Sequence, residues 1–216
     1  MTTPSTKDRI LDAAEIQFAE HGYDGTSLRT ITQTAQVNLA AVHYHFGSKV
    51  QLFQALFERR VGPINDERLA RLRTLQEECG ERGPELEQVL EAFFAPVVAH
   101  VGACDEGLRR FVQLAGRINS TKGEHVEAVH DVFREVQERF FPVLEQLLPE
   151  LGMPDLLWRL HFLIGSMCTV VSDTERLKLW SGGACDSTDP EQVLRQLVAF
   201  SAGGLRAAPV KKPVSQ

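Results

Sequence analysis

The stretch NLAAVHYHFGSK, residues 38–49, places two histidines around a tyrosine and follows them with Phe-Gly-Ser-Lys. On a helix, side chains two positions apart point about 200° away from each other, so His43 and His45 cannot converge on one metal ion. Neither histidine has a glutamate or cysteine four residues later that would complete a site. The stretch therefore predicts no metal site, and it is either a core segment or a surface that contacts another molecule.

Helical periodicity divides the stretch between those two roles. Leu39, Val42 and Phe46 follow the spacing i, i+3, i+7, so we expect them to hold the helix against its neighbours. The side chains left off that face are Ala40, Ala41, His43, Tyr44 and His45. Small alanines allow a close backbone approach, and the rings behind them offer hydrogen-bonding groups, as a helix in the major groove of DNA requires.

The residues around the stretch carry the start and stop signals of short helices. Thr26, Asn38 and Ser48 are each placed to cap the beginning of a helix, and Gly47 to end one. These signals predict three short helices in the arrangement of a helix-turn-helix unit, followed by a fourth helix over about 48–62.

The rest of the chain reads as longer helices divided by breaker segments, without period-2 strand patterns. The expected fold is all-α, with a helix-turn-helix domain over residues 1–50 and a helical ligand-binding and dimerisation domain over 51–206. Residues 207–216 read as a flexible tail. Gly62 and Pro63 predict a kink or link at the end of the fourth helix.

Composition narrows the class of protein. The net charge is −6, yet residues 25–60 hold four basic side chains and only one acidic side chain, which favours an anionic partner there. No apolar run is long enough to span a membrane, and the first residues lack the apolar core of an export signal. The four cysteines show no CxxC spacing, which is typical of reduced thiols. We therefore expect a cytoplasmic protein without a membrane partner.

A resemblance to a known family rests on three segments: TSLRTI at 26–31, AQVN at 35–38 and YHFGSK at 44–49. Together they resemble the TetR family of transcriptional repressors over roughly the first 60 residues. Two positions differ from the common pattern. Gln36 stands where a turn glycine is common and would be strained at a positive φ. His43 stands where many members have a tyrosine, and this bears on which operator is read.

The resemblance implies double-stranded operator DNA as a partner. Phosphate contacts are implied for Thr26, Ser27, Tyr44, His45 and Lys49. Exposure to the DNA groove is implied for Asn38, Leu39, Ala40, Ala41 and His43. No catalytic residue, metal ligand or cofactor is expected.

For the larger domain, the resemblance implies dimerisation and a ligand pocket. Because one short helix reads only a few base pairs, a two-fold dimer is also expected on physical grounds, through helices at about 155–178 and 190–206. Residues proposed to line the pocket are Phe94, Val98, Phe111, Leu114, Ile118, Phe133, Gln137, Phe141 and His161. Apolar stripes of this kind equally form ordinary core, so that alternative stays open.

A narrower resemblance concerns the effector. NLAAVHYHFGSK, together with LLWRLHF at 156–162, is similar to the PsrA-type branch of the family, which responds to long-chain fatty acids. It implies a small apolar effector such as a fatty acid or an acyl-CoA, and an apolar cavity to hold it.

Two other functions remain to be weighed. One is an all-α small-molecule-binding protein or enzyme with a helix-turn-helix-like corner, and the other is a helical interaction bundle. The sequence has no GxSxG, phosphate-loop or HExxH motif, which argues against an enzyme. A bundle would not require the locally basic segment with its exposed hydrogen-bonding groups.

Overall fold

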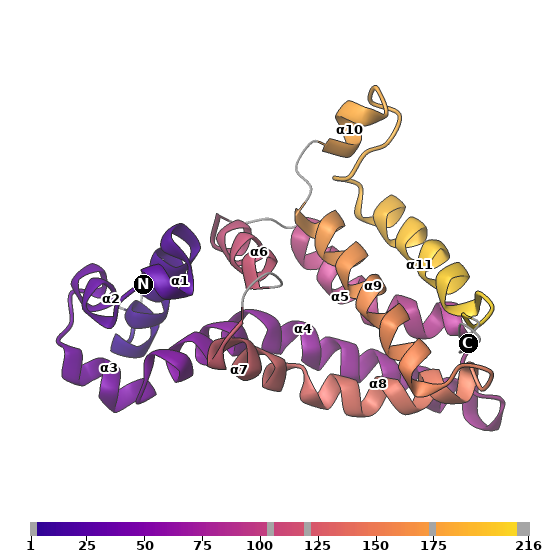
Figure 1. Cartoon of the computed structure of the whole chain (residues 1–216), viewed down its shortest axis with the longest axis horizontal. Coiled ribbons are helices and arrows are strands. Elements are labelled where there is room, and N and C mark those ends of the chain that lie inside the picture. Colours follow the sequence, from indigo (N-terminus) through magenta and orange to yellow (C-terminus); the bar gives the residue numbers. More distant parts are fainter. Residues whose placement is uncertain (1–3, 103–105, 119–121, 173–175, 211–216) are drawn as a thin grey trace, which may run out of the picture. The chain divides into compact units, whose positions relative to one another are not determined.

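The computed structural model describes residues 4–102, 106–118, 122–172 and 176–210. All regular elements within these ranges are helices, which confirms the predicted all-α class. Figure 1 shows them in sequence colours. The chain folds as two compact units: unit 1, residues 1–65 and 104–134, and unit 2, residues 66–103 and 135–216.

Unit 1 contains the helix-turn-helix. Its helices are α1 (Thr6–Gly25), α2 (Leu28–Ala35), α3 (Leu39–Phe46), the first part of α4 (Lys49–Cys79), α6 (Glu106–Ile118) and α7 (Glu124–Val132). Phe18, Ile31, Val42, Phe46 and Phe53 are buried in one common core. Helix α1 packs against α2, α3 and α6. The short α2 and α3 are thus held by the longer helices around them.

Unit 1 is larger than the predicted DNA-binding domain of residues 1–50. The same core also contains Leu52 from α4, Phe111 and Leu114 from α6, and Val129 from α7. Helices α1, α2 and α3 alone bury too little apolar surface, so these later helices complete the unit.

Unit 2 is a second helical bundle. Its elements are the rest of α4, the 3-10 turn η1 (Gly80–Arg82), α5 (Leu86–Gly102), α8 (Arg134–Leu147), α9 (Met153–Ser172), α10 (Arg176–Trp180) and α11 (Pro190–Arg206). Helix α11 packs along α5 and α9, as the ribbon also shows (Figure 1). Phe94, Phe140, Leu156 and Leu205 are buried in its core.

The predicted end of the fourth helix near Gly62 and Pro63 is wrong. Helix α4 continues through both residues to Cys79. A proline inside a helix removes one backbone hydrogen bond, which ordinarily costs about 3 kcal/mol. Val61 and Ile64, on either side of these two residues, are buried, and that packing offsets the loss.

The predicted helix at about 155–178 corresponds in the described residues to α9 (Met153–Ser172) and α10 (Arg176–Trp180). Residues 173–175, where the two predicted parts would join, lie outside the described residues, as does most of the predicted tail. Among the described helices, none is both long and apolar enough to cross a membrane.

Candidate nucleic-acid interface

Helix α3 presents one face to the core and the other to solvent. The Asn38 side chain accepts a hydrogen bond from the Ala41 backbone N–H at 2.8 Å, which confirms the predicted cap. Val42 and Phe46 are buried as predicted, but Leu39 is 46% exposed. The prediction that Leu39 pins the helix is wrong, because the first turn of α3 extends beyond the core.

The polar side chains of α3 lie on that solvent-facing side. Tyr44 is 85% exposed, and its ring contacts the ring of His45 edge-on at 5.1 Å between centroids. His43 Nδ1 lies 2.8 Å from the Gly47 carbonyl oxygen. Because a carbonyl only accepts, Nδ1 is the donor in this hydrogen bond. The α3 surface (Leu39, Ala40, His43, Tyr44 and His45) therefore combines small, apolar and hydrogen-bonding groups.

The turn before α3 is held in a left-handed conformation. Gln36 has φ 53° and ψ 48°, so the position expected to prefer glycine does require a positive φ. Arg9 Nη2 donates to the carbonyl oxygens of Ala35 at 2.6 Å and Gln36 at 2.9 Å. These bonds satisfy carbonyls that the end of α2 leaves unpaired. Sequence reasoning missed Arg9, since it lies far from the turn in the chain.

The predicted role of Thr26 is wrong. Ser27, not Thr26, caps α2, and its hydroxyl accepts from the Thr30 backbone N–H at 3.1 Å. Thr26 is buried, and its hydroxyl lies within hydrogen-bond distance of two α1 carbonyls, at 2.9 Å from Gln17 and 2.7 Å from Gly22. Its side chain therefore ties α1 to the turn and does not face an outside partner, whereas Ser27 is exposed.

The beginning of α4 offers a second polar feature. Ser48 accepts a hydrogen bond from the Gln51 backbone N–H at 3.2 Å, as expected of a cap. The Lys49 ammonium lies 4.1 Å from the centroid of the Tyr23 ring, a cation–π contact. Partial burial lowers the pKa of Lys49, while Asp24 acts in the opposite direction. A helix N-terminus beside an ammonium group favours anions.

The basic segment does not present all its charges to an outside partner. Arg59 and Arg60 both bind the buried carboxylate of Glu15 on α1, with closest separations of 2.7 Å and 2.6 Å. Arg59 also pairs with Asp12 at 2.7 Å. The interpretation of residues 25–60 as a patch for an anion is corrected accordingly, because half of its cations hold α1 to α4.

Comparison with protein families decides the identity of this arrangement. Residues 10–56 match the model of bacterial regulatory proteins of the tetR family, and residues 91–204 match the tetracyclin repressor-like C-terminal domain. The chain belongs to the TetR family. Residues 10–56 thus carry the helix-turn-helix of this family of bacterial regulatory proteins.

Curated relatives match a short part of this TetR-family regulator. The biofilm operon icaADBC negative transcriptional regulator IcaR of Staphylococcus aureus is 42% identical over 48 residues, which are 22% of this chain and 26% of IcaR. The chain thus spans about a quarter of that curated relative.

Solved structures agree over nearly the whole chain. The fatty acid degradation regulator FadR of Bacillus halodurans superposes with a TM-score of 0.61 at 19% identity, over 95% of this chain and 99% of that one. FadR of Bacillus subtilis in complex with stearoyl-CoA has a TM-score of 0.54 at 18% identity, over 89% and 97%. At these identities the likeness shows the shared fold.

The residues predicted to line a ligand pocket divide between the two units of this TetR-family regulator. Phe111, Leu114, Ile118 and Phe133 belong to or pack on the core of unit 1. Those in unit 2 are Phe94, Val98, Gln137, Phe141 and His161. Phe94 is fully buried and His161 is exposed, so even this second set is spread between core and surface.

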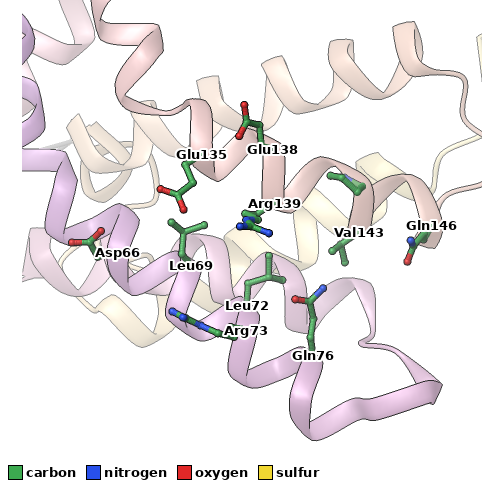
Figure 2. Close-up of a pocket in the computed structure, with 11 residues that line it drawn as sticks. Asp66, Leu69, Leu72, Arg73, Gln76, Glu135, Glu138, Arg139, Val143 and Gln146 are labelled. Atoms are coloured by element: carbon green, nitrogen blue, oxygen red, sulfur yellow. The ribbon is translucent and has the colours of Figure 1, made fainter.

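An open groove lies between α4 and α8 in unit 2 (Figure 2). Its volume is about 670 Å³. Leu69, Leu72 and Val143 provide apolar lining, and Arg73 and Arg139 reach it from opposite helices. Three carboxylates also line it: Asp66, Glu135 and Glu138. No signal in the sequence predicts this groove, because it depends on which faces of two distant helices meet.

Proposed function

We propose that this TetR-family regulator is a homodimeric repressor whose affinity for operator DNA is changed by an amphipathic acyl effector. The observation that carries the DNA-binding part is the α3 surface, with Tyr44 85% exposed opposite the buried Val42. Such a protein acts in the cytoplasm, where it meets its operator.

The DNA contacts in this proposal follow from the side chains that α3 leaves free. Leu39, Ala40 and His43 face base edges, with Asn38 at the leading end of the helix, whereas Ala41 is half-buried and packs against the core. Phosphates are bound by Ser27, Tyr44, His45 and Lys49, around the N-termini of α2 and α4. Thr26 has no part in it, because its hydroxyl is buried.

The dimer in this proposal forms through α9 and α11. Both helices carry large apolar side chains on their exposed sides: Leu157, Trp158, Phe162, Ile164 and Phe200. Trp158 and Phe162 stack at 5.6 Å and are each 61% exposed. Exposed aromatic groups gathered on neighbouring helices mark an interaction surface.

We expect the full chain to bind a duplex taken from upstream of its own gene, with affinity falling steeply as salt rises. Tyr44→Ala should weaken binding by roughly tenfold, because a hydrogen bond to a charged phosphate is lost. Gel-shift titrations at several salt concentrations measure both effects. Trp180→Ala is the matched control, since this aromatic side chain is also exposed, at 76%, but lies in unit 2. Failure of the wild-type chain to bind at low salt contradicts the proposal.

The effector class rests on two observations. FadR of Bacillus subtilis, a fold relative, was solved with stearoyl-CoA. In the α4–α8 groove, apolar side chains lie beside Arg73 and Arg139, which form no ion pair within the described residues. This combination suits an amphipathic anion. Phe94, Val98, Gln137, Phe141 and His161, which the sequence predicts to line the pocket, are not among the residues that line this groove. A ligand changes DNA affinity only if it binds one conformation more tightly, and α4, which enters both units, is the helix whose position it would bias.

Stearoyl-CoA should change the midpoint of the DNA titration by about tenfold or more at saturation, within the usual range of allosteric coupling. Coenzyme A alone is the control for the head group, and stearate is the control for the chain. Arg73→Gln combined with Arg139→Gln should weaken the response to stearoyl-CoA while leaving DNA binding without effector intact. If neither stearoyl-CoA nor stearate alters the titration, an acyl effector is excluded.

A further inference from the structure

A cluster of three rings in unit 1 includes one, Tyr23, that contacts the Lys49 side chain. The Tyr23 ring, on α1, lies 4.1 Å from the Lys49 ammonium. The same ring stacks on the imidazole of His125, with centroids 4.0 Å apart and planes 12° from parallel. Phe53 contacts both rings edge-on, at 5.0 Å from Tyr23 and 5.7 Å from His125. Tyr23 thus joins an α7 side chain to the first residue of α4.

The backbone before His125 is shaped to admit this ring. Gly123 precedes α7 with φ 133°, a conformation that L side chains rarely adopt. A Cβ placed on Gly123 would lie 3.2 Å from Cε1 and Nδ1 of the imidazole, which is tighter than ordinary packing. His125 is only 3% exposed. Its position is therefore fixed by close contacts on more than one side.

We propose that His125 is a positioning residue for operator binding, which holds the Tyr23 ring and through it sets the position of the Lys49 ammonium. The inference rests on the proposed phosphate contact of Lys49. His125 lies within the segment that matches the C-terminal family domain, yet it packs on α1 in unit 1. The stack thus gives that segment a direct contact with a residue that holds the proposed DNA-binding lysine.

The physical reason lies in the freedom of the lysine side chain. A free lysine loses roughly 2 kcal/mol of rotamer entropy when it is fixed on a phosphate. A ring held in place at cation–π distance restricts the ammonium in advance, so less entropy is lost on binding DNA. Tyr23 can do this only if its own orientation is fixed, and the parallel His125 ring and the edge of Phe53 provide that.

The test compares operator titrations of full-length variants over a range of salt. His125→Ala should weaken binding to the upstream duplex by about threefold to tenfold, and make the salt dependence shallower by about one phosphate contact. His125→Phe, which retains a stacking ring, should restore most of the affinity. In a Lys49→Gln background, His125→Ala should cause no further loss, because the residue through which it acts is absent. Thermal unfolding of each variant identifies those that fold.

A second pair of variants covers the case in which His125→Ala does not fold. Tyr23→Phe keeps the ring and should bind like wild type, whereas Tyr23→Leu keeps apolar volume but should lose affinity and salt dependence as His125→Ala does. Equal losses with and without Lys49, or an unchanged salt slope in folded variants, overturn the inference. Wild-type chain that binds no upstream duplex would instead refute the proposed function itself.

Discussion

Glu15→Ala is expected to lower the free energy of unfolding of unit 1 by about 3 kcal/mol, within the range seen when one member of a buried ion pair is removed. The Glu15 side chain is 4% exposed and binds Arg59 and Arg60, which are each 25% exposed. Removal of the carboxylate leaves two partly buried guanidinium groups without the negative charge that they share. Urea unfolding followed by circular dichroism measures the change in free energy.

Asp12→Asn is the matched control for this prediction. Asp12 binds the same Arg59 at the same 2.7 Å distance, but its side chain is 61% exposed. Exposed ion pairs contribute less than about 1 kcal/mol, so this variant should remain near wild type. Glu15→Gln, which retains shape and hydrogen bonding without charge, should fall between the two. Equal effects of Glu15→Ala and Asp12→Asn would show that burial of the network does not stabilise the fold.

Trp158→Asp combined with Phe162→Asp should convert the proposed dimer to a monomer and weaken operator binding by roughly 100-fold or more. Buried aromatic residues at the centre of an interface commonly contribute at least about 2 kcal/mol each. A monomer also loses the second half-site, and with it the gain from binding two linked sites at once. Sedimentation measures the mass, which should fall from twice the 24.1 kDa chain to the single chain.

Tyr44→Ala provides the reciprocal control for the dimer. It removes a side chain from the α3 surface in unit 1, so the mass should stay that of a dimer while operator binding falls. The double aspartate variant should retain its helical circular dichroism, because both side chains are 61% exposed within the chain. A variant that still sediments as a dimer would exclude the α9–α11 face as the interface.

Local signals explain how far the site could be predicted. Asn38 and Ser48 cap their helices as expected, because a cap bonds to a backbone group only three residues away. Val42 and Phe46 are buried because helical periodicity alone sets their common face. The prediction that Thr26 caps α2 is wrong. Thr26 and Ser27 both carry the hydroxyl that a cap requires, and only their burial in the folded protein distinguishes them.

The larger errors arise from contacts between distant parts of the chain. Gly62 and Pro63 carry a breaker signal, yet burial on either side keeps α4 continuous to Cys79. Apolar stripes such as Phe94 and Phe111 both read as pocket lining, but they belong to the cores of different units. A stripe shows that a helix buries one face, and the partner of that face depends on how the helices pack.

By itself, the sequence determined the all-α class, the helix-turn-helix and most of the residues that α3 turns toward solvent, because capping and helical period act over a few residues. Tertiary structure alone decided that Arg59 and Arg60 bind Glu15, that Arg9 supports the turn at Gln36, and that Tyr23 lies against His125. Those contacts join side chains far apart in sequence, and the distance at which two charges or rings meet is set only when their helices are packed.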